Sequence, residues 1–498
     1  MLLGPLFEGV DADVPHGGVG VRVTDVTEDS RTALPGSLFI AREGTQVSGA
    51  RFLDQAAASG AVAALVASAA VVDRPPAGMT MVRCDDPSLA GAVVAERFWG
   101  EPSRRLYAAA VTGTNGKSTV AHSIWRLLNT SGVRTGLIGT VTVDDGSRVS
   151  DANLTTPPAT EISQTLSCMV DAGCDAVALE ASSHALHQHR VAGLSLNAGV
   201  FTNLTGDHLD YHGTMEDYAS AKAVLFEMLP ESAVAVVNAD DPAHERMIRD
   251  CKASVVRCSL ESQVEATAEI LEHSGAGMTI RFDGEWGELE VEVPLLGEHN
   301  AMNLLQGLAV AHHSGVSRDS LGHALSMIDA PAGRLERVSS TPGAPNVLID
   351  FAHTDDALDR VLQAVRAVVD HSGELIVVFG CGGDRDRSKR ARMGEVAARR
   401  ADRIVITSDN PRTEDPSTII SDILEGIPAH AKRRSVVHAD RARAIEAAIE
   451  SAGSADLVLI AGKGHEQTQI IGDELIPFDD REVAARCLAN RAAEGARS

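Results

Sequence analysis

Short apolar runs that end in polar or glycine-rich residues recur along this chain, and they constrain its fold more than any other feature. From residue 106 to about residue 337 such runs alternate with helical patterns, at 106–111, 176–179, 198–201 and 234–237. The last third repeats the alternation at 347–351, 375–379, 403–407 and 457–461. This alternation predicts mainly parallel sheets covered by helices. Because ligands of such sheets bind beyond the carboxyl ends of the strands, we expect the functional residues there.

The chain of 498 residues is long enough for about three domains of the usual size. A linker-like break at Glu101-Pro102-Ser103 and the strand patterns after it predict domains at 1–104, 105–337 and 338–498. In the first domain, the apolar run 38–40 and an alanine-rich helical pattern over 52–69 indicate a small α/β fold. In the second, 278–293 is typical of a β-hairpin that turns at Asp283-Gly284, and 300–313 is typical of a helix.

The charge balance and the cysteine pattern exclude several classes of protein. The chain has 44 Lys and Arg against 69 Asp and Glu, a net charge of −25, and it has no basic tract. A general nucleic-acid binder needs a clustered basic surface, so we expect no nucleic-acid partner. The seven cysteines form no C-x-x-C pair, and no run of about eighteen apolar residues occurs. We therefore expect reduced thiols, a cytoplasmic location and no membrane insertion.

A glycine-rich segment between a predicted strand and a predicted helix has the pattern of a phosphate-binding loop. It comprises Gly113, Thr114, Asn115, Gly116, Lys117, Ser118 and Thr119. Glycines let backbone N–H groups converge on phosphate oxygens, Lys117 supplies a cation, and the hydroxyl of Ser118 or Thr119 can bind Mg²⁺. The full pattern has a glycine where Val111 stands, so this loop is a shortened variant. The alternative is a glycine-rich turn with a solvated lysine.

Acidic and histidine residues follow two further predicted strands. Glu180 comes directly after the run 176–179, where a carboxylate that faces a phosphate loop can hold Mg²⁺. The run 198–201 leads into a cluster that indicates ligand or metal binding, formed by Asp207, His208, Asp210 and His212. Lys222 lies in a helical pattern, and its spacing alone favours an ordinary solvated lysine.

Taken together, the motifs of this chain closely resemble those of the Mur ligases, and the resemblance spans nearly the whole chain. In the first two thirds it rests on Asp29-Ser30-Arg31, Pro35-Gly36, the loop 113–119, Thr155-Thr156-Pro157, the segments 180–184 and 202–212, and Lys222. In the last third it rests on Gly333-Arg334, the segments 350–354 and 380–387, Asp409-Asn410-Pro411-Arg412, and Gly462-Lys463-Gly464-His465-Glu466. The order and spacing of these motifs carry the resemblance.

The resemblance implies three α/β domains and an ATP-dependent ligase of peptidoglycan precursor synthesis. The small N-terminal domain would bind the UDP-sugar, a central P-loop-type domain would bind ATP, and a Rossmann-like C-terminal domain would bind the amino acid. In the members that add the third peptide residue, the D-glutamyl carboxylate of UDP-N-acetylmuramoyl-L-alanyl-D-glutamate attacks the γ-phosphate of ATP. An amine then displaces phosphate from the acyl phosphate and forms an amide. The expected oligomeric state is a monomer.

The resemblance also assigns site residues. It implies catalytic roles for Lys117, Glu180, His208 and Lys222, with Lys222 as a carbamate (N6-carboxylysine). Two Mg²⁺ sites would be formed by Ser118, Glu180, His208 and the carbamate. ATP would contact the phosphate loop together with Asn303, Arg334, Asp350 and His353. The UDP-sugar dipeptide would contact Ser30, Thr45, Gln46, Thr155, Thr156, Ser182, Gln188 and Arg190.

The amino acid that Mur ligases of this type add is mostly meso-diaminopimelate or L-lysine, and one residue favours the former. Diaminopimelate carries an extra carboxylate, which the planar guanidinium of Arg412 could bind with two hydrogen bonds. The remaining contacts implied by the resemblance are Arg385, Asp409, Asn410, Pro411, Gly462 and Glu466, with Glu466 suited to the distal ammonium. We therefore expect meso-diaminopimelate, with L-lysine as the alternative.

Three departures from the family pattern affect substrate fit rather than the reaction. Leu154 stands where an asparagine is common, Ser48 where an acidic residue is usual, and Asp355 where a proline is usual. Three other functions stay open: another ligase of the Mur or folylpolyglutamate type, a nucleotide-dependent switch that needs no amino acid, and an inactive homologue.

Overall fold

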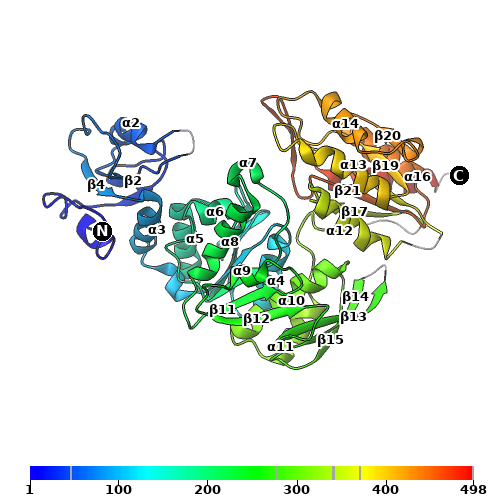
Figure 1. Ribbon diagram of the computed structural model, residues 1–498, viewed down its shortest axis with the longest axis horizontal. Coiled ribbons are helices and arrows are strands. Elements are labelled where there is room, and N and C mark those ends of the chain that lie inside the picture. The colour runs from blue at the N-terminus through cyan, green and yellow to red at the C-terminus, as the bar shows by residue number, and fades with distance from the viewer. Residues whose placement is uncertain (45–46, 275–276, 339–342, 370–371, 496–498) are drawn as a thin grey trace. The chain divides into compact units, whose positions relative to one another are not determined.

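The computed structural model (Figure 1) describes residues 1–44, 47–274, 277–338, 343–369 and 372–495. The contacts within the chain divide it into two compact units. The first unit comprises Met1–Leu204, His212–Cys258 and Gln306–Leu321. The second unit comprises Thr205–Tyr211, Ser259–Leu305 and Gly322–Ser498.

The N-terminal part of the first unit is a parallel sheet in the order β1, β2, β3, β4. Its strands are β1 (Asp25–Thr27), β2 (Ser37–Ile40), β3 (Ala63–Ala67) and β4 (Thr80–Cys84), and its helices are α1 (Leu3–Leu6), the 3₁₀ helix η1 (Gly49–Phe52), α2 (Leu53–Ala58) and α3 (Pro87–Phe98). The helix predicted over 52–69 is wrong beyond Ala58. Gly60, at φ +102°, follows the end of α2, and the five buried residues of β3 pair with β2 and β4. Periodicity alone cannot separate such a short, fully buried apolar run from a helix.

The central sheet of the first unit runs in the order β12, β11, β10, β5, β9, β6, β7, β8. It is parallel from β12 to β6 and antiparallel at β7 and β8, which confirms the predicted mainly parallel sheet. The strands are β5 (Tyr107–Thr112), β6 (Thr135–Ile138), β7 (Thr142–Asp144), β8 (Val149–Asp151), β9 (Ala176–Glu180), β10 (Ala198–Phe201), β11 (Val234–Asn238) and β12 (Ser254–Ser259). The helices are η2 (Pro102–Arg105), α4 (Lys117–Thr130), α5 (Ala159–Asp171), α6 (Ser183–His187), α8 (Met215–Glu227) and α9 (His244–Met247).

The second unit begins, in chain order, with α7 (Leu209–His212), most of which belongs to it, and an antiparallel group of three strands. These are β13 (Ala266–Ser274), β14 (Gly277–Asp283) and β15 (Leu289–Val293). The hairpin predicted over 278–293 is confirmed, with β14 ending at the predicted turn. The helix predicted over 300–313 is confirmed as α10 (Glu298–His313), and α11 (Arg318–Ser326) follows it. Both helices are divided between the units, because Gln306–Leu321 belongs to the first.

The C-terminal sheet has the order β16, β17, β21, β18, β19, β20 and is parallel except for the pairing of β16 with β17. All four strands predicted in this region are present. The strands are β16 (Glu336–Val338), β17 (Asn346–Asp350), β18 (Leu375–Phe379), β19 (Arg403–Ile406), β20 (Ser435–Val437) and β21 (Leu457–Ala461), and β22 (Thr468–Ile471) and β23 (Glu474–Pro477) form a separate hairpin. The helices are α12 (Asp355–Arg366), α13 (Ser388–Arg400), α14 (Pro416–Glu425), η3 (Lys432–Arg434), α15 (Arg441–Ser451) and α16 (Asp480–Gly495).

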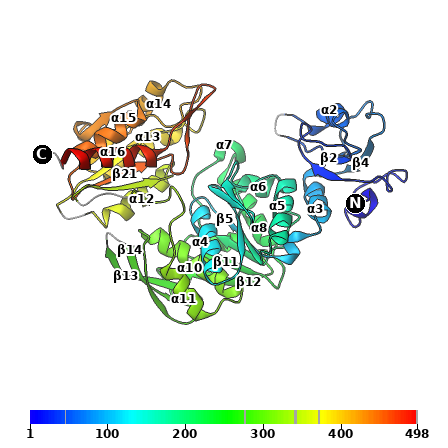
Figure 2. The ribbon, with the colours of Figure 1, turned by 180° about the vertical axis from the view of Figure 1, so that it is seen from behind.

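Helices cover both faces of the C-terminal sheet. Helices α12, α13 and α14 pack on one face around Val377 and Phe379, and α15 and α16 pack on the other around Ile376 and Val378 (Figures 1 and 2). Successive residues of β18 therefore point to opposite apolar layers, as expected for a doubly covered strand. The apolar residues stop at the ends of the strands, so the candidate functional residues lie there. Within the described residues, no helix is long and apolar enough to span a membrane.

Candidate active site

The predicted phosphate loop connects β5 to α4, and its backbone requires glycine. Gly113 adopts φ +149° and Gly116 φ +86°. A Cβ atom on Gly113 would lie only 1.8 Å from the Oγ1 atom of Thr202, so no other residue fits there without displacing the end of β10. The loop therefore passes the neighbouring strand at backbone distance and leads into the N-terminus of α4, where anions bind favourably.

Two residues at the end of β10 fix the shape of this loop. The backbone N–H groups of Thr114 and Asn115 donate to the carbonyl and the side-chain Oδ1 of Asn203, at 2.8 and 2.9 Å. The Asn203 amide returns a hydrogen bond to the Asn115 carbonyl at 3.0 Å, and the Thr202 hydroxyl donates to the same carbonyl at 2.6 Å. The Lys117 ammonium donates to the carbonyls of Gly113 and Thr114, at 3.0 and 2.9 Å, and so lies against its own loop.

Glu180 is the last residue of β9, and its carboxylate lies beside the phosphate loop. The side chain is buried and accepts from the Ser118 hydroxyl at 3.0 Å, the Thr140 N–H at 2.6 Å and the Thr140 hydroxyl at 2.9 Å. A carboxylate and two hydroxyls are oxygen donors of the kind that Mg²⁺ prefers, so these residues fit the predicted metal. No group of three or more His, Cys, Asp or Glu side chains in the described part of the chain is arranged to hold a metal ion. Thr140 was absent from the sequence prediction, because nothing in its local pattern marks it.

The residues predicted to contact the dipeptide of the substrate form one network with Glu180. Thr156 donates from its hydroxyl to the Glu180 carbonyl at 2.7 Å and lies 3.3 Å from the Ser182 hydroxyl. The Arg190 guanidinium donates to the Thr156 carbonyl at 2.6 Å and to Gln188 Oε1 at 2.8 Å. The Thr155 hydroxyl accepts from Thr140 at 3.1 Å. The structure thus brings these five predicted residues together beside Glu180, at the end of β9.

Lys222 is buried within α8, contrary to the solvated lysine that its spacing alone favoured. Its ammonium donates to the Gly113 carbonyl at 2.8 Å and lies 4.3 Å from the centre of the Tyr218 ring. The Tyr218 hydroxyl in turn lies 3.2 Å from the Thr114 hydroxyl. Burial, followed by the nearby His184, His187 and Lys222, lowers the pKa of His212 to about 4. His212 is therefore neutral at pH 7 beside this lysine.

The N-terminal residues predicted to bind the UDP group are described only in part. Ser30 is buried, and its hydroxyl donates to the Gln55 side chain at 2.9 Å. Thr45 and Gln46 lie outside the described residues. Ser48, one of the departures from the family pattern, caps η1 and donates to Glu43 at 2.8 Å, and Leu154 is exposed.

In the second unit, the predicted nucleotide contacts Arg334, Asp350 and His353 surround Phe351. The Arg334 guanidinium lies 4.9 Å from the centre of the Phe351 ring, and the His353 ring lies 4.7 Å from it. Asp350 accepts from the N–H groups of Leu335 and Ala352, both at 2.8 Å, and burial raises its pKa. Asn303, also in this unit, donates to Asn300 at 3.2 Å.

His208 belongs to the second unit, whereas Glu180 and Lys222 belong to the first. A metal site that combines all three therefore stays a prediction. Burial alone would raise the pKa of Asp207, but the positive charges of His208, His353 and Lys389 outweigh burial and lower it. Within the second unit, Asp207 and His208 are thus grouped with His353 and Lys389.

The residues predicted to bind the acceptor amino acid meet at the ends of β18, β19 and β21. Asn410 donates to Glu466 Oε2 at 2.8 Å, and the buried Lys463 ammonium donates to Asn410 Oδ1 at 3.1 Å and to Glu466 Oε2 at 2.9 Å. Gly462, at φ +114°, lies against Asp409 so closely that a Cβ atom would be 2.6 Å from Asp409 Oδ2. Lys463 belongs to the motif Gly462-Lys463-Gly464-His465-Glu466, but no role was predicted for it.

Arg412 is half-buried among these residues, and one nitrogen of its guanidinium donates a hydrogen bond to a backbone carbonyl. Its Nη1 donates to the Gly383 carbonyl at 2.8 Å. Burial, followed by the charge of Arg385, lowers its pKa, and Asp409 and Glu466 only partly offset this effect. Among the described residues no carboxylate forms an ion pair with Arg412, whereas nearby Arg387 and Arg390 both pair with Glu414. Two neighbouring cations without a paired carboxylate form a site suited to an anionic group.

The loop after β18 is held by Glu414, and this contact predicts a pH-dependent stability. Hydrogen bonds from Arg390, then from the Asp384 N–H and from Arg387, lower the pKa of Glu414 from its ordinary 4.5 to about 2. Glu414 therefore contributes stability above pH 4.5, and this contribution is lost as the pH falls from 4.5 towards 2.

The variant Glu414→Gln should therefore have a lower urea midpoint than the wild type at about pH 6, with the difference shrinking towards about pH 3. The control is Glu395→Gln, at an exposed glutamate of α13. A Glu414→Gln difference that stays constant over this pH range would contradict the assignment.

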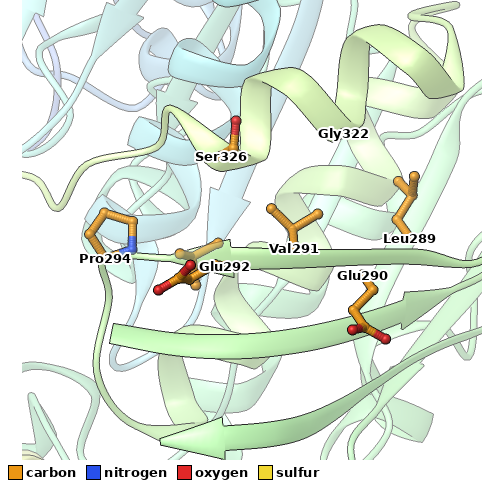
Figure 3. Close-up of a pocket in the computed structure, with 8 residues that line it drawn as sticks. Leu289, Glu290, Val291, Glu292, Pro294, Gly322 and Ser326 are labelled. Atoms are coloured by element: carbon orange, nitrogen blue, oxygen red, sulfur yellow. The ribbon is translucent and has the colours of Figure 1, made fainter. Parts of the chain in front are cut away.

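A pocket of about 660 Å³ lies between β15 and α11, and its lining residues differ from those of the site described above (Figure 3). It is lined by Leu289, Glu290, Val291, Glu292, Val293, Pro294, Gly322 and Ser326. None of the residues singled out from the sequence lines it, so it is not part of the site described here.

These features define an α/β protein with a glycine-rich loop after β5 in the central sheet and a cluster of polar and charged residues at the strand ends of the C-terminal sheet. Three family models match the chain: "Mur ligase family, catalytic domain" at residues 22–99, "Mur ligase middle domain" at 111–311 and "Mur ligase, glutamate ligase domain" at 333–464. The chain belongs to the Mur ligase family, which confirms the resemblance and the predicted three-domain α/β fold. The boundaries at 104 and 337 stay a prediction.

Individual similar proteins indicate which members of the family this chain resembles. The chain is 44% identical to the UDP-N-acetylmuramoyl-L-alanyl-D-glutamate--2,6-diaminopimelate ligase of Synechococcus elongatus, over 96% of both chains. A solved structure of a ligase of that name matches with a TM-score of 0.70 and 32% identity, covering 99% of this chain and 100% of the other. The MurF ligase of Thermotoga maritima in complex with ADP matches with a TM-score of 0.65 over 95% of this chain and 99% of the other, and at 16% identity shows the fold alone.

Proposed function

We propose that this protein is the ATP-dependent ligase that joins meso-diaminopimelate to UDP-N-acetylmuramoyl-L-alanyl-D-glutamate in peptidoglycan precursor synthesis. The observation that carries the choice of amino acid is the half-buried Arg412, which has Arg385 beside it and no paired carboxylate among the described residues. The name of the Synechococcus elongatus relative, a diaminopimelate ligase, supports the same substrate. The reaction belongs to cell wall biogenesis, and hence to cell shape and division, and we place it in the cytoplasm.

The reaction has two steps. In the first, a D-glutamyl carboxylate oxygen bonds to the γ-phosphorus of ATP, the bond to the β-phosphate oxygen breaks, and ADP leaves. In the second, the neutral amine of diaminopimelate attacks the acyl carbon, phosphate leaves with the bonding electrons, and the amine loses a proton. Because a phosphoryl transfer offers little covalent work to a protein, positioning and charge neutralisation supply most of the rate.

The phosphate loop is the part of the chain suited to the triphosphate. Its glycines place backbone N–H groups at the N-terminus of α4, and Lys117 lies against the loop, where it can contact phosphate oxygens. Arg334, Asp350, His353 and Asn303 are the proposed nucleotide contacts of the second unit. Thr155, Thr156, Ser182, Gln188 and Arg190 offer hydroxyl, amide and guanidinium groups to the anionic dipeptide, and Ser30 with Thr45 and Gln46 is proposed for the UDP group.

Ser118 and Glu180 are the residues that would hold Mg²⁺, which when bound neutralises phosphate charge. A second Mg²⁺ would be held by Lys222 in its carbamate form, and the part of His208 in it stays a prediction because His208 belongs to the other unit. Lys222 is buried and its nitrogen lies 2.8 Å from the Gly113 carbonyl oxygen, so a carbamate formed on that nitrogen would lie beside the phosphate loop. Carbamate formation is a bond between the neutral lysine nitrogen and the carbon of CO₂, with loss of one proton.

Glu180→Gln should raise the Mg²⁺ concentration needed for half-maximal phosphate release by roughly tenfold or more, because an amide is a weaker ligand than a carboxylate. The amide can keep the hydrogen bond from Thr140, so the fold should be preserved. The measurement is a Mg²⁺ titration at saturating ATP. An unchanged Mg²⁺ dependence would remove Glu180 from the metal site.

The proposed function is tested by phosphate release from ATP with Mg²⁺, the UDP-sugar dipeptide and one amino acid at a time. We expect release to require both the dipeptide and meso-diaminopimelate. Release with L-lysine instead would keep the ligase and overturn the substrate. Release that needs no amino acid would favour a nucleotide-dependent switch, and no release under any condition would favour an inactive homologue.

A further inference from the structure

A fully buried ion pair joins two helices of the C-terminal domain next to the residues proposed to bind the amino acid. Arg441 is the first residue of α15 and Asp480 the first residue of α16. The guanidinium donates through Nε to Asp480 Oδ1 at 2.8 Å and through Nη2 to Oδ2 at 2.6 Å, and both side chains are 0% exposed. This is the two-pronged geometry that gives arginine–carboxylate pairs their directional specificity.

The same guanidinium also contacts two strand ends. Its Nη2 donates to the carbonyl of Ala461, at 3.0 Å, and its Nη1 donates to the carbonyl of Ser408, at 3.4 Å. Ala461 directly precedes Gly462, and Ser408 directly precedes Asp409. Arg441 therefore contacts the last residue before each of the two segments proposed to bind the amino acid.

These two strand ends are not neighbours in the sheet, because β18 lies between β21 and β19. The segments that follow these strands pack so closely that even an added Cβ atom would not fit. A Cβ atom on Gly380, after β18, would lie 2.4 Å from the Thr407 carbonyl oxygen, and one on Gly462 would lie 2.6 Å from Asp409 Oδ2. The ladder of β18 fixes the strands themselves, while the segments beyond the strands depend on contacts such as those of Arg441.

We propose that Arg441 and Asp480 are a positioning pair that sets the spacing between the segments 409–412 and 462–466, and so aligns Arg412 with Glu466 for the acceptor amino acid. This inference rests on the proposed function. Stability alone does not account for the pair, because well-packed apolar residues in place of a buried ion pair often leave stability unchanged or raise it. The charge of Arg441 also interacts with the site: burial lowers the pKa of Arg441, but Asp480, and after it Asp409 and Glu466, raise it.

The decisive variant replaces both partners, Arg441→Met with Asp480→Leu, so that no single charge is left buried. We expect the KM for diaminopimelate to rise roughly tenfold or more, because a small displacement of a binding group has effects of that size. The KM for ATP should change less than about twofold, because the contacts of Arg441 lie at the amino-acid segments. Arg441→Lys keeps the charge but lacks the planar fork, and it should give an intermediate KM for diaminopimelate.

The control is Ile449→Val, which removes one methyl group from the same apolar layer as Ala444 and Val458. It should lower the melting temperature without a change in either KM, which separates loss of stability from loss of positioning. If the double variant folds and its KM for diaminopimelate equals that of the wild type, the positioning role is overturned. If the double variant does not fold, the Arg441→Lys variant decides instead: a KM for diaminopimelate equal to that of the wild type would overturn the positioning role. Absence of diaminopimelate-dependent turnover in the wild type would instead overturn the proposed function, and this inference with it.

Discussion

Replacing Lys117 by methionine should reduce phosphate release roughly a thousandfold, the largest effect that we expect of any single substitution. The ammonium of Lys117 lies against the phosphate loop, bonded to the carbonyls of Gly113 and Thr114, and methionine has a similar length but no charge. The loop itself should keep its shape, because Asn203 and Thr202 hold it from the end of β10. The loss should therefore appear in kcat with little change in the melting temperature.

The matched control is Lys252→Met, the same substitution at an exposed lysine of the first unit. It should leave phosphate release unchanged. Activity of Lys117→Met within about tenfold of the wild type would mean that the backbone of the loop carries the phosphates without the lysine.

Arg412→Ala should reduce kcat/KM for meso-diaminopimelate by about 1.5–3 kcal/mol, or roughly tenfold to more than a hundredfold, the cost of a charged hydrogen-bonded partner. L-Lysine lacks the distal carboxylate, so its weaker use should change little. The structure supports this difference, because Arg412 has no paired carboxylate among the described residues while Arg387 and Arg390 are both paired. The ratio of the two kcat/KM values should fall.

Arg433→Ala, at an exposed arginine of the same domain, controls for loss of a positive charge. It should leave the ratio between the two amino acids as in the wild type. An Arg412→Ala variant that loses activity with both amino acids equally would place Arg412 in the fold or in catalysis, and a variant with unchanged kinetics would remove the specificity argument.

Much of the fold follows from the sequence because apolar runs of four to six residues in a doubly covered sheet are nearly continuous. The strands at 198–201 and 375–379 were predicted with the bounds of β10 and β18. The same physics explains the failure at 52–69, where β3 is short, rich in alanine and as apolar as a buried helix. The hydrogen-bonding partners across each sheet could not be read from the sequence, because they depend on contacts between distant segments.

The candidate site was predictable to the extent that its residues directly follow strands or fall in motifs. Glu180 and Gly462 directly follow predicted apolar runs, Asp409 follows one after a single serine, and all three lie at strand ends as expected. Thr140, Lys463 and the Arg441–Asp480 pair have no local signature, because each acts through a partner far along the chain or at a helix end. Lys222 shows the opposite case, since helical spacing predicted an exposed lysine and the structure buries it, while its functional role is implied by the resemblance alone.

The monomeric state, the carbamate on Lys222 and the assignment of His208 to a metal site stay predictions. The central claim is that this chain adds meso-diaminopimelate, and it is tested most directly by the product. Purified protein would be incubated with ATP, Mg²⁺, UDP-N-acetylmuramoyl-L-alanyl-D-glutamate and equal concentrations of meso-diaminopimelate and L-lysine, and the nucleotide product identified by its mass. We predict the diaminopimelate tripeptide in great excess, with one ADP formed per product. A lysine tripeptide as the main product, or ADP formed without any tripeptide, would contradict the account.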